Sequence, residues 1–517
     1  MQKKYLKSVL VIILTAFFLR GLFLVAIFPI FSGQDEARHY NTIQYLATGQ
    51  SKNCINFQGD VRQVKRNLDT YRYSDEIKET VPISQTEKIR SENYNKINFR
   101  NDFNGQGEKE FKNKRPAKIQ HSCPPDVAGN ALVKSDFSLY HRVLSVVESG
   151  LSEQNIFIRY YVLRIISVFL GTITLLLAYK IFRLINFSGK ESLLLTTAIS
   201  FQPKFSIYFT NINYDSLLIF LWTSFLLLGV LILKKGWSLW RAIILFIVLW
   251  LALWTKPSAL ALLVMLIYLL IYQVYQVLKK RNKKNKIKFR QIFLMVVMII
   301  LLGFLLYPSL KKIGIFNLSA TEYTDKITIY LKKSFSKIHG SSRNYWGGLK
   351  GDELTLRFVE IIWVLEYIAW SGLVFWQLVC LKKIRQLLNR IIGYFKESEK
   401  EIISGRCLIK FSQKYARYFY FLLFGIFSLQ LAIRVADWKM FVATGKLTLG
   451  TPGRYWLPNI ISHFAILVFG WKVWLNCFFS AEKRKKYMLR GLMAFVLLMI
   501  LYWSYEVFIV IIPEYYL

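Results

Sequence analysis

Two carboxylates and an imidazole stand close together just after the first apolar run of the chain. Asp35 and His39 are four residues apart and Glu36 lies between them, so a helix that starts here places all three on one face. A carboxylate in this place can accept the proton of an arriving hydroxyl group, as a general base does. The alternative is structural: Asp35 caps a short interfacial helix, and Glu36 complements the positive end of that helix.

A membrane-embedded helical bundle is the framework that must position these groups. Of the 517 residues, 54% are apolar and 19% are charged, and several apolar runs reach the roughly 18 residues that a spanning helix needs. The first run is too long for a signal-peptide core and has no cleavage pattern after it, so we expect a retained helix. The sequence predicts an all-α polytopic membrane protein with about eleven transmembrane helices. They cover residues 6–28, 157–182, 190–209, 214–233, 238–255, 257–278, 291–310, 358–381, 417–435, 455–476 and 488–512.

The formal charge of +38 lies mostly in short loops between these helices. Lys and Arg collect at residues 183–190, 234–241, 279–290, 382–417 and 482–490. Because cytoplasmic loops carry such an excess, we expect a multi-pass protein of the cell membrane with a cytoplasmic N-terminus. A charge this basic would also suit a nucleic-acid-binding protein. Its distribution favours topology and contact with membrane lipids instead, so we expect no nucleic-acid partner.

This orientation leaves two large extracytoplasmic segments. Residues 29–156 include the Asp-Glu pair and lack clear periodicity over much of their length, which is typical of functional or partly disordered loops. Within them, Phe137–Val147 predicts an amphipathic helix on the outer surface. The predicted organisation is a first helix at 1–28, an outer loop at 29–156, helices two to seven at 157–310, a second outer loop at 311–357 and helices eight to eleven at 358–517. We assign no chemistry to the second loop.

The predicted topology also sorts the five cysteines. Cys54 and Cys123 fall in the first outer loop, whereas the other three lie near or within the cytoplasmic side. This predicts a disulfide between Cys54 and Cys123 in an oxidising compartment. The sequence contains no Cys/His cluster with zinc spacing, nucleophile elbow, phosphate-binding Gly-rich loop or dinucleotide fingerprint.

Three further outer boundaries carry polar side chains. Tyr214 and Asp215 lie in a turn between two predicted spans, where Asp215 either serves a site or caps the next helix. Lys256 lies in an otherwise apolar hairpin, either at a site or extended to the interface. Arg454 has no acidic partner nearby in sequence, and a lipid-linked phosphate would supply one because guanidinium binds phosphate oxygens bidentately. The alternative for Arg454 is an anchor to ordinary headgroups.

Five short motifs follow one another along the chain. They are Pro29-x-Phe31-x-Gly33-x-Asp35-Glu36, Leu139-Tyr140, Asn213-Tyr214-Asp215, Lys256-Pro257 and Gly453-Arg454-Tyr455. This order resembles the GT-C superfamily of integral-membrane glycosyltransferases, and more closely a family of predicted bacterial membrane proteins within it. The family pattern His-Pro-Pro-Leu-Tyr reads Phe-Ser-Leu-Tyr-His at residues 137–141.

The resemblance implies a sugar donor linked to a polyprenyl phosphate or diphosphate, inversion at the anomeric carbon and an acceptor on the outer face. It maps the catalytic base onto Asp35, with Glu36 beside it. Together with the polar boundaries, it implies substrate-binding roles for His39, Tyr140, Tyr214, Asp215, Lys256, Arg454 and Tyr455. No organic cofactor is expected, although Asp35, Glu36 and His39 could ligate a divalent metal.

We therefore expect a GT-C-like enzyme with an extracytoplasmic active site that transfers the lipid-linked sugar to a cell-envelope glycan, polymer or lipid. Two other classes stay open. A lipid-linked oligosaccharide flippase would bind and release the phosphosugar unchanged, and would bury ionisable residues near the membrane midplane. A non-catalytic assembly protein would leave Asp35 and Arg454 more than about 15 Å apart, because only a base and a phosphate site must bracket one sugar.

Overall fold

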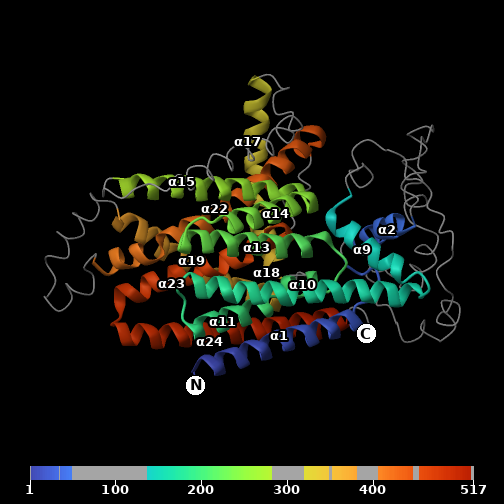
Figure 1. Cartoon of the computed structure of the whole chain (residues 1–517), viewed down its shortest axis with the longest axis horizontal. Helices are drawn as coiled ribbons and strands as arrows, with labels where there is room; N and C mark the ends of the chain where they lie inside the picture. Colours follow the sequence, from blue (N-terminus) through green and yellow to red (C-terminus); the bar gives the residue numbers. More distant parts are fainter. Residues whose placement is uncertain are drawn as a thin grey trace.

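Long helices run side by side through most of the protein, as the computed structural model shows (Figure 1). The structure describes residues 2–33, 35–48, 137–281, 320–347, 352–380, 406–445 and 453–513. Within these ranges every regular element is a helix, and eight helical segments are long and apolar enough to cross a membrane. They are Lys4–Ile27, Ile156–Leu184, Tyr214–Lys235, Pro257–Gln276, Glu353–Val379, Lys414–Trp438, Gly453–Phe478 and Ala481–Ile511. The prediction of an all-α polytopic membrane protein is confirmed.

The predicted spans correspond closely to the long helices. These are α1 (Gln2–Ile27), α10 (Ile156–Leu184), α13 (Tyr214–Lys235), α14 (Leu239–Thr255), α15 (Ala261–Arg281), α19 (Glu353–Cys380), α22 (Arg406–Thr444), α23 (Ile460–Phe478) and α24 (Ala481–Tyr505). With 17 residues, α14 is a shorter apolar helix than the other candidates. The span predicted at 291–310 lies outside the described residues.

The prediction of one continuous helix over 190–209 is wrong. The segment divides into α11 (Gly189–Ser200) and α12 (Pro203–Tyr208). Proline has no backbone N–H and sits favourably at a first helical position, so Pro203 starts a new helix instead of extending the old one. The Gln202 side chain caps that helix by accepting a hydrogen bond from the Phe205 N–H.

Both pieces still run along the length of the bundle. A side-chain β-carbon at Gly189 would overlap Leu6 near the start of α1, whereas the Ile212 N–H binds Glu36 just beyond the end of α1. The chain therefore passes from one end of the bundle to the other with a break in the middle. That break places the polar residues around Gln202 inside the bundle.

Two short helices, α2 (Glu36–Ala47) and α9 (Leu139–Gly150), pack against each other near the end of α1 (Figure 1). The predicted helix over 137–147 is confirmed as α9, which buries Tyr140, His141 and Leu144 on one face. Tyr140 and Leu144 join an apolar cluster with Phe31 and Tyr160. The cluster holds the turn before α2 against α10.

A helical turn, η3 (Gly453–Asn459), leads into α23 and packs tightly on α18 (Ile338–Trp346). A β-carbon at Gly453 would overlap the backbone of Ser341 and Tyr345 in α18. Glycine therefore permits an approach that no other residue allows, and this contact fixes the position of Arg454. The remaining short elements are η2 (Pro257–Leu260), α17 (Ala320–Ser336) and the π-helical turn η4 (Glu506–Ile511).

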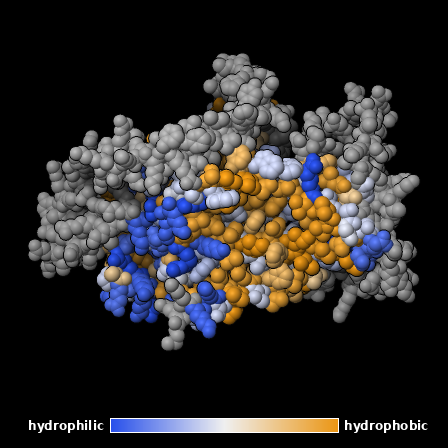
Figure 2. Space-filling view, in the orientation of Figure 1, coloured by the Kyte–Doolittle hydropathy of each residue, from blue (hydrophilic) through white to orange (hydrophobic). Residues whose placement is uncertain are grey.

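Hydrophobic side chains form a broad band across the middle of the visible face, and hydrophilic ones gather toward the left end (Figure 2). Large apolar residues on the long helices are exposed, among them Phe169, Trp240 and Leu431. Such a surface is costly in water but suits lipid tails, which surround a spanning helix over about 30 Å. The surface therefore agrees with a membrane-embedded bundle.

Candidate functional site

Glu36 forms a buried ion pair with Arg164 of α10. Both side chains are inaccessible to solvent, and Arg164 Nε and Nη2 donate to Glu36 Oε1 and Oε2 at 2.9 and 2.8 Å. The backbone N–H groups of Ile212 and Gly33 donate to the same two oxygens, each at 2.9 Å. Four donors thus occupy the acceptor sites of one carboxylate. Glu36 positions the turn that carries Asp35, and the expected catalytic role does not fit this environment.

Arg164 also fixes the end of α1. Its Nη1 atom donates to the Phe28 carbonyl at 2.7 Å, and its Nη2 atom donates to the Pro29 carbonyl at 2.9 Å. Carbonyl groups at a helix end have no partners within the helix, so these bonds satisfy groups that are otherwise left open. Arg164 was not among the expected site residues. Its signal in the sequence is an arginine within an apolar run, which is costly unless it is paired.

Asp35 adopts a left-handed backbone conformation, with φ 60° and ψ 12°. This conformation is uncommon for residues with side chains, although aspartate tolerates it better than most. The Asp35 side chain makes no capping hydrogen bond to α2; its Oδ2 atom accepts one from Arg454 Nη2 at 3.1 Å. The side chain is 37% exposed, so a hydroxyl group in solution can reach it. Asp35 therefore occupies the N-cap position of α2, as the structural alternative expected, but its side chain bonds to Arg454 and not to the helix.

Arg454 is largely buried and uses only part of its hydrogen-bonding capacity. Nη2 donates to Asp35 and to the Tyr455 hydroxyl, each at 3.1 Å. Nε and Nη1 are buried and make no hydrogen bond of regular geometry among the described residues, although the Tyr208 hydroxyl also interacts with the guanidinium. The donor capacity of Nε and Nη1 is therefore only partly used. A buried cation in this state is suited to receive an anion.

Lys256 and Asp215 form a second ion pair at 2.6 Å beside the first. Lys256 Nζ also lies 4.7 Å from the ring centre of Tyr214 and 4.3 Å from that of Tyr455. Tyr455 thereby connects Lys256 with Arg454, because its ring faces one cation and its hydroxyl binds the other. Burial alone would lower the pKa of Lys256, but Asp215 and the two tyrosines outweigh burial and raise it.

The capping alternative for Asp215 is wrong. Asn213 caps α13, because its side chain accepts a hydrogen bond from the Asp215 N–H at 2.8 Å. The Asp215 carboxylate is left for Lys256. Lys256 in turn is buried and paired instead of extending to an interface. Six expected residues thus meet in one network: Asp35, Tyr214, Asp215, Lys256, Arg454 and Tyr455.

Lys204 of α12 adds a third cation that sequence analysis missed. Its side chain is buried, its Nζ lies 5.7 Å from the ring centre of Tyr208, and its charge repels that of Arg454. The buried carboxylate of Glu506 also acts on Lys204, so three cations here accompany the carboxylates of Asp35, Asp215 and Glu506. Lys204, Lys256 and Arg454 are the side chains of this region that can bind a phosphate. A lysine inside an apolar run was the available signal.

His39 and Tyr140 contact the turn before α13, next to the network. His39 Nδ1 and His141 Nε2 are 2.9 Å apart, and the His39 ring contacts the Tyr214 ring edge-on with centres 4.7 Å apart. The Tyr140 hydroxyl accepts a hydrogen bond from the Asn213 N–H at 3.1 Å. Both side chains therefore hold the turn before α13 in place. Burial lowers the pKa of His141 to about 3.

The expected metal set does not converge in the described residues. Glu36 is bonded to Arg164 and His39 to His141, so Asp35, Glu36 and His39 do not face one common point. The part of the chain that the structure describes contains no group of three or more His, Cys, Asp and Glu side chains that could hold a metal ion. Cys54 and Cys123 lie outside the described residues, and their disulfide stays a prediction.

The helical bundle and its charged network define a polytopic membrane protein with a polar site at the ends of several helices. The chain belongs to the family described as Predicted membrane protein (DUF2142), whose model matches residues 17–367. The match covers more than half of the chain and includes Asp35 and Lys256, but it ends before Arg454. The expected likeness to a family of predicted membrane proteins is confirmed, and the description names no activity. No curated protein matches the chain.

Proposed function

We propose that the protein is a membrane glycosyltransferase of the GT-C type. It transfers a sugar from a polyprenyl-phosphate or polyprenyl-diphosphate donor to a cell-envelope glycan, polymer or lipid on the extracytoplasmic face. Asp35 is the general base and Arg454 holds the donor phosphate. The observation that carries the proposal is the 3.1 Å contact between these two side chains, which are 419 positions apart in the sequence.

The contact meets a geometric requirement of sugar transfer. A base and a phosphate ligand must lie within the span of one sugar ring, because the acceptor hydroxyl and the leaving phosphate occupy opposite sides of the anomeric carbon. A non-catalytic assembly protein has no such requirement. Asp35 is partly exposed, so the base has access to solvent. Arg454 is largely buried, so a phosphate bound there meets little competing water.

In the proposed reaction, the acceptor oxygen attacks the anomeric carbon from the side opposite the phosphate. The bond between that carbon and the phosphate oxygen breaks, its electron pair leaves with the lipid phosphate, and Asp35 takes the hydroxyl proton. Attack from the opposite side inverts the anomeric configuration. Negative charge grows on the phosphate as the bond breaks, and the N–H groups of Arg454, with Lys204 and Lys256, stabilise it.

A flippase for lipid-linked oligosaccharides is the second candidate. The observation that favours it is a pair of ionisable residues within candidate spans: His463 Nε2 of α23 lies 2.8 Å from Glu366 Oε1 of α19. Such residues in a spanning segment often mark a transport pathway. The Asp35–Arg454 contact favours the enzyme, because a transporter has no need for a base beside the phosphate.

One experiment separates these functions. The full chain is purified into nanodiscs and given polyprenyl-phosphate and polyprenyl-diphosphate sugars, with envelope glycan or glycolipid as acceptor. The enzyme releases lipid phosphate and forms a glycoside of inverted configuration, which mass spectrometry and anomeric proton NMR detect. The same donors are then placed in one leaflet of proteoliposomes. Movement to the other leaflet without loss of the sugar would overturn the proposal in favour of the flippase.

A further inference from the structure

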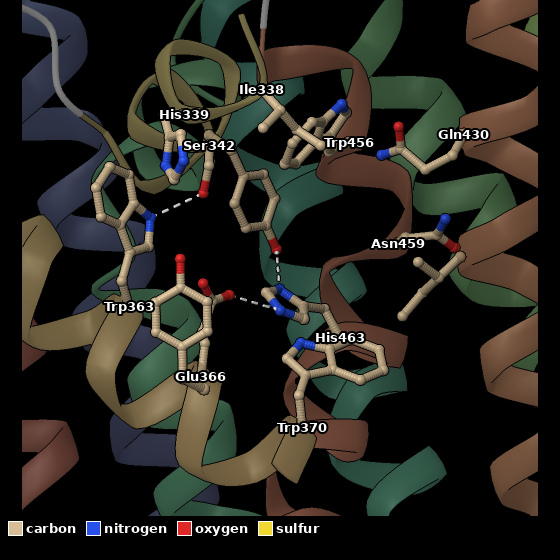
Figure 3. Close-up of a pocket in the computed structure, with 13 residues that line it drawn as sticks. Ile338, His339, Ser342, Trp363, Glu366, Trp370, Gln430, Trp456, Asn459 and His463 are labelled. Atoms are coloured by element: carbon tan, nitrogen blue, oxygen red, sulfur yellow. Dashed lines mark hydrogen bonds and ion pairs between the residues drawn. The ribbon is translucent and has the colours of Figure 1, made fainter. Parts of the chain in front are cut away.

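A cavity with a mainly apolar wall lies next to the charged network and is not used by the proposed reaction. It has a volume of about 350 Å³ and is enclosed by α18, α19, α22, η3 and α23. Trp456, one of its lining residues, follows Arg454 and Tyr455 directly on η3. Aromatic rings from Tyr345, Trp363, Tyr367, Trp370 and Trp456 make up much of its wall (Figure 3). A volume of this size is at the lower end for ligand pockets, so it suits one small ring system.

A chain of hydrogen bonds fixes the polar part of the wall. The Tyr345 hydroxyl and His463 Nδ1 are 3.0 Å apart, and His463 Nε2 lies 2.8 Å from Glu366 Oε1 (Figure 3). Trp363 Nε1 donates to the Ser342 hydroxyl at 2.9 Å, which holds one of the rings in place. The cavity is therefore preorganised, because the orientations of its polar side chains are set by their neighbours.

Two polar side chains offer the cavity groups that a ligand can bond to. Gln430 contributes an amide, which can both donate and accept, and Glu366 contributes a carboxylate. Asn459 also lines the cavity, but its Nδ2 atom donates to the Gly425 carbonyl at 2.8 Å, and its Oδ1 atom has no accessible surface. Trp456 Nε1 is enclosed in the same way, so Trp456 contributes its ring.

The chemistry of these groups selects among ligands. A hydrocarbon chain would leave the Gln430 amide facing an apolar ligand without a partner. An ammonium group would suit the rings, but the Glu366 carboxylate that would balance its charge is already paired with His463. A phosphate would lie beside the carboxylate of Glu366. Sugar hydroxyl groups both donate and accept, and the C–H faces of a sugar ring can pack on aromatic side chains.

We propose that this cavity binds a saccharide ring. The ring packs against the tryptophans while its hydroxyl groups bond to the amide of Gln430 and the carboxylate of Glu366. Tyr367, at 61% exposure, lines the cavity on the side of α19 where Val364 is also exposed. The cavity thus opens toward a surface suited to lipid, so a saccharide carried on a lipid can reach it. That the ring belongs to a substrate rests on the proposed function; that the cavity binds a saccharide does not.

Binding is tested on the full chain in nanodiscs, with butyl glycosides of glucose, galactose, mannose and N-acetylglucosamine as probes. Butanol and butyltrimethylammonium are the matched probes without a sugar. Affinity comes from calorimetry, and saturation-transfer NMR reports which ligand protons lie against aromatic rings. We expect at least one glycoside to bind more tightly than both matched probes, through its ring protons. Equal binding of butanol or of the ammonium probe would overturn the proposal.

Three variants locate the binding. Trp370→Leu removes one of the aromatic rings and Gln430→Leu removes the amide, so each should weaken glycoside binding by about 10-fold. Gln273→Leu makes the same chemical change on α15, away from the cavity, and should have no effect. Wild-type affinity in both cavity variants would refute the site. Circular dichroism of each variant confirms that a loss of binding is not a loss of fold.

Two further measurements separate this inference from the proposed function and identify the source of the ring. Asp35→Asn should bind the glycoside like the wild type, because Asp35 does not line the cavity. In a transfer assay, Gln430→Leu should raise KM for one substrate only: for the donor if the ring is the donor sugar, or for the acceptor if it is the acceptor glycan. Glycoside binding without any transfer would sink the enzyme but keep the cavity assignment. If sugar transfer occurs and Gln430→Leu leaves both KM values unchanged, the enzyme proposal stands and the cavity assignment fails.

Discussion

The Asp35 carboxylate and the Arg454 guanidinium bind each other directly across the start of α2 and η3, with Oδ2 and Nη2 3.1 Å apart. Neither residue is held there by its neighbours in sequence alone. Asp35 depends on the Glu36–Arg164 pair, and Arg454 depends on the close approach of Gly453 to α18. Each of these supports can be tested separately.

Removal of the base should stop transfer without disturbing the fold. Asparagine keeps the size of Asp35 and can still accept a hydrogen bond from Arg454, but it cannot take a proton from the acceptor. We expect Asp35→Asn to lower the rate on the order of 100-fold to 10,000-fold while donor affinity changes little. Single-turnover transfer and donor titration measure the two quantities. Glu353→Gln, an exposed change on α19, is the control, and near wild-type turnover in Asp35→Asn would remove it as the base.

Removal of the neighbouring carboxylate should act on stability. Glu36→Gln leaves Arg164 as a buried cation without its counter-charge, and breaking a buried pair in this way commonly costs about 3–5 kcal/mol. We therefore expect a clearly lower melting temperature in detergent and a lower yield, with Asp35→Asn unaffected in both respects. Activity per folded molecule should fall less than in Asp35→Asn. A Glu36→Gln protein that melts like the wild type would contradict the positioning role.

Arg454 should govern use of the donor. Arg454→Ala removes the guanidinium N–H groups, and we expect donor affinity to fall by roughly 10-fold to 100-fold, as for charged hydrogen bonds. Arg454→Lys should restore only part of it, because an ammonium lacks the fork of a guanidinium. Binding of purified lipid-linked sugar measures both, with Arg357→Ala on the exposed face of α19 as control. Unchanged affinity in Arg454→Ala would place the phosphate elsewhere.

The α2–α9 pair should weaken in acid. The pKa of His141 is about 3 in the folded protein, because burial disfavours the charged ring, and about 6.5 when the chain is unfolded. Below pH 6.5 the unfolded chain therefore binds a proton that the folded protein does not. This contribution to stability is intact above pH 6.5 and is lost as pH falls toward 3, by up to about 1.4 kcal/mol per pH unit. Melting temperatures from pH 7 to pH 4 should fall less in His141→Phe; an identical pH profile would contradict this.

The fold was largely predictable because spanning helices depend on local composition. Runs of apolar residues predict α1, α10 and α13 without knowledge of their partners. The break before Pro203 was missed because the apolar content of 190–209 hides it, although proline and Gln202 together indicate a helix start. Hydropathy averages over a window and cannot report where backbone hydrogen bonding is interrupted.

The site was predictable in its residues but not in its pairings. Asp35, Lys256 and Arg454 stood out as polar groups at the ends of apolar runs. Their partners follow from packing between distant helices, which sequence spacing does not contain. Glu36 was expected in the catalytic site beside Asp35 for this reason: only the fold shows that Glu36 pairs with Arg164 inside the bundle, whereas the more exposed Asp35 pairs with Arg454.

The break between α11 and α12 has a consequence for biogenesis. The Ser200 carbonyl, at the end of α11, is satisfied by the side chains of Arg20 and Ser206, and the Gln202 amide donates to the Tyr345 carbonyl of α18. The Ser200 carbonyl thus has partners from α1 and from its own segment, whereas the buried Gln202 amide has this partner only once α18 is made. A buried polar group without a partner costs several kcal/mol in lipid. The Tyr345 partner is synthesised 143 positions later than Gln202. The test labels a Ser200→Cys variant with water-soluble cysteine reagents in ribosome-bound chains of two lengths. We expect chains that end before residue 338 to be labelled and chains that extend beyond α18 to be protected. Equal labelling of both would show that the segment closes on its own.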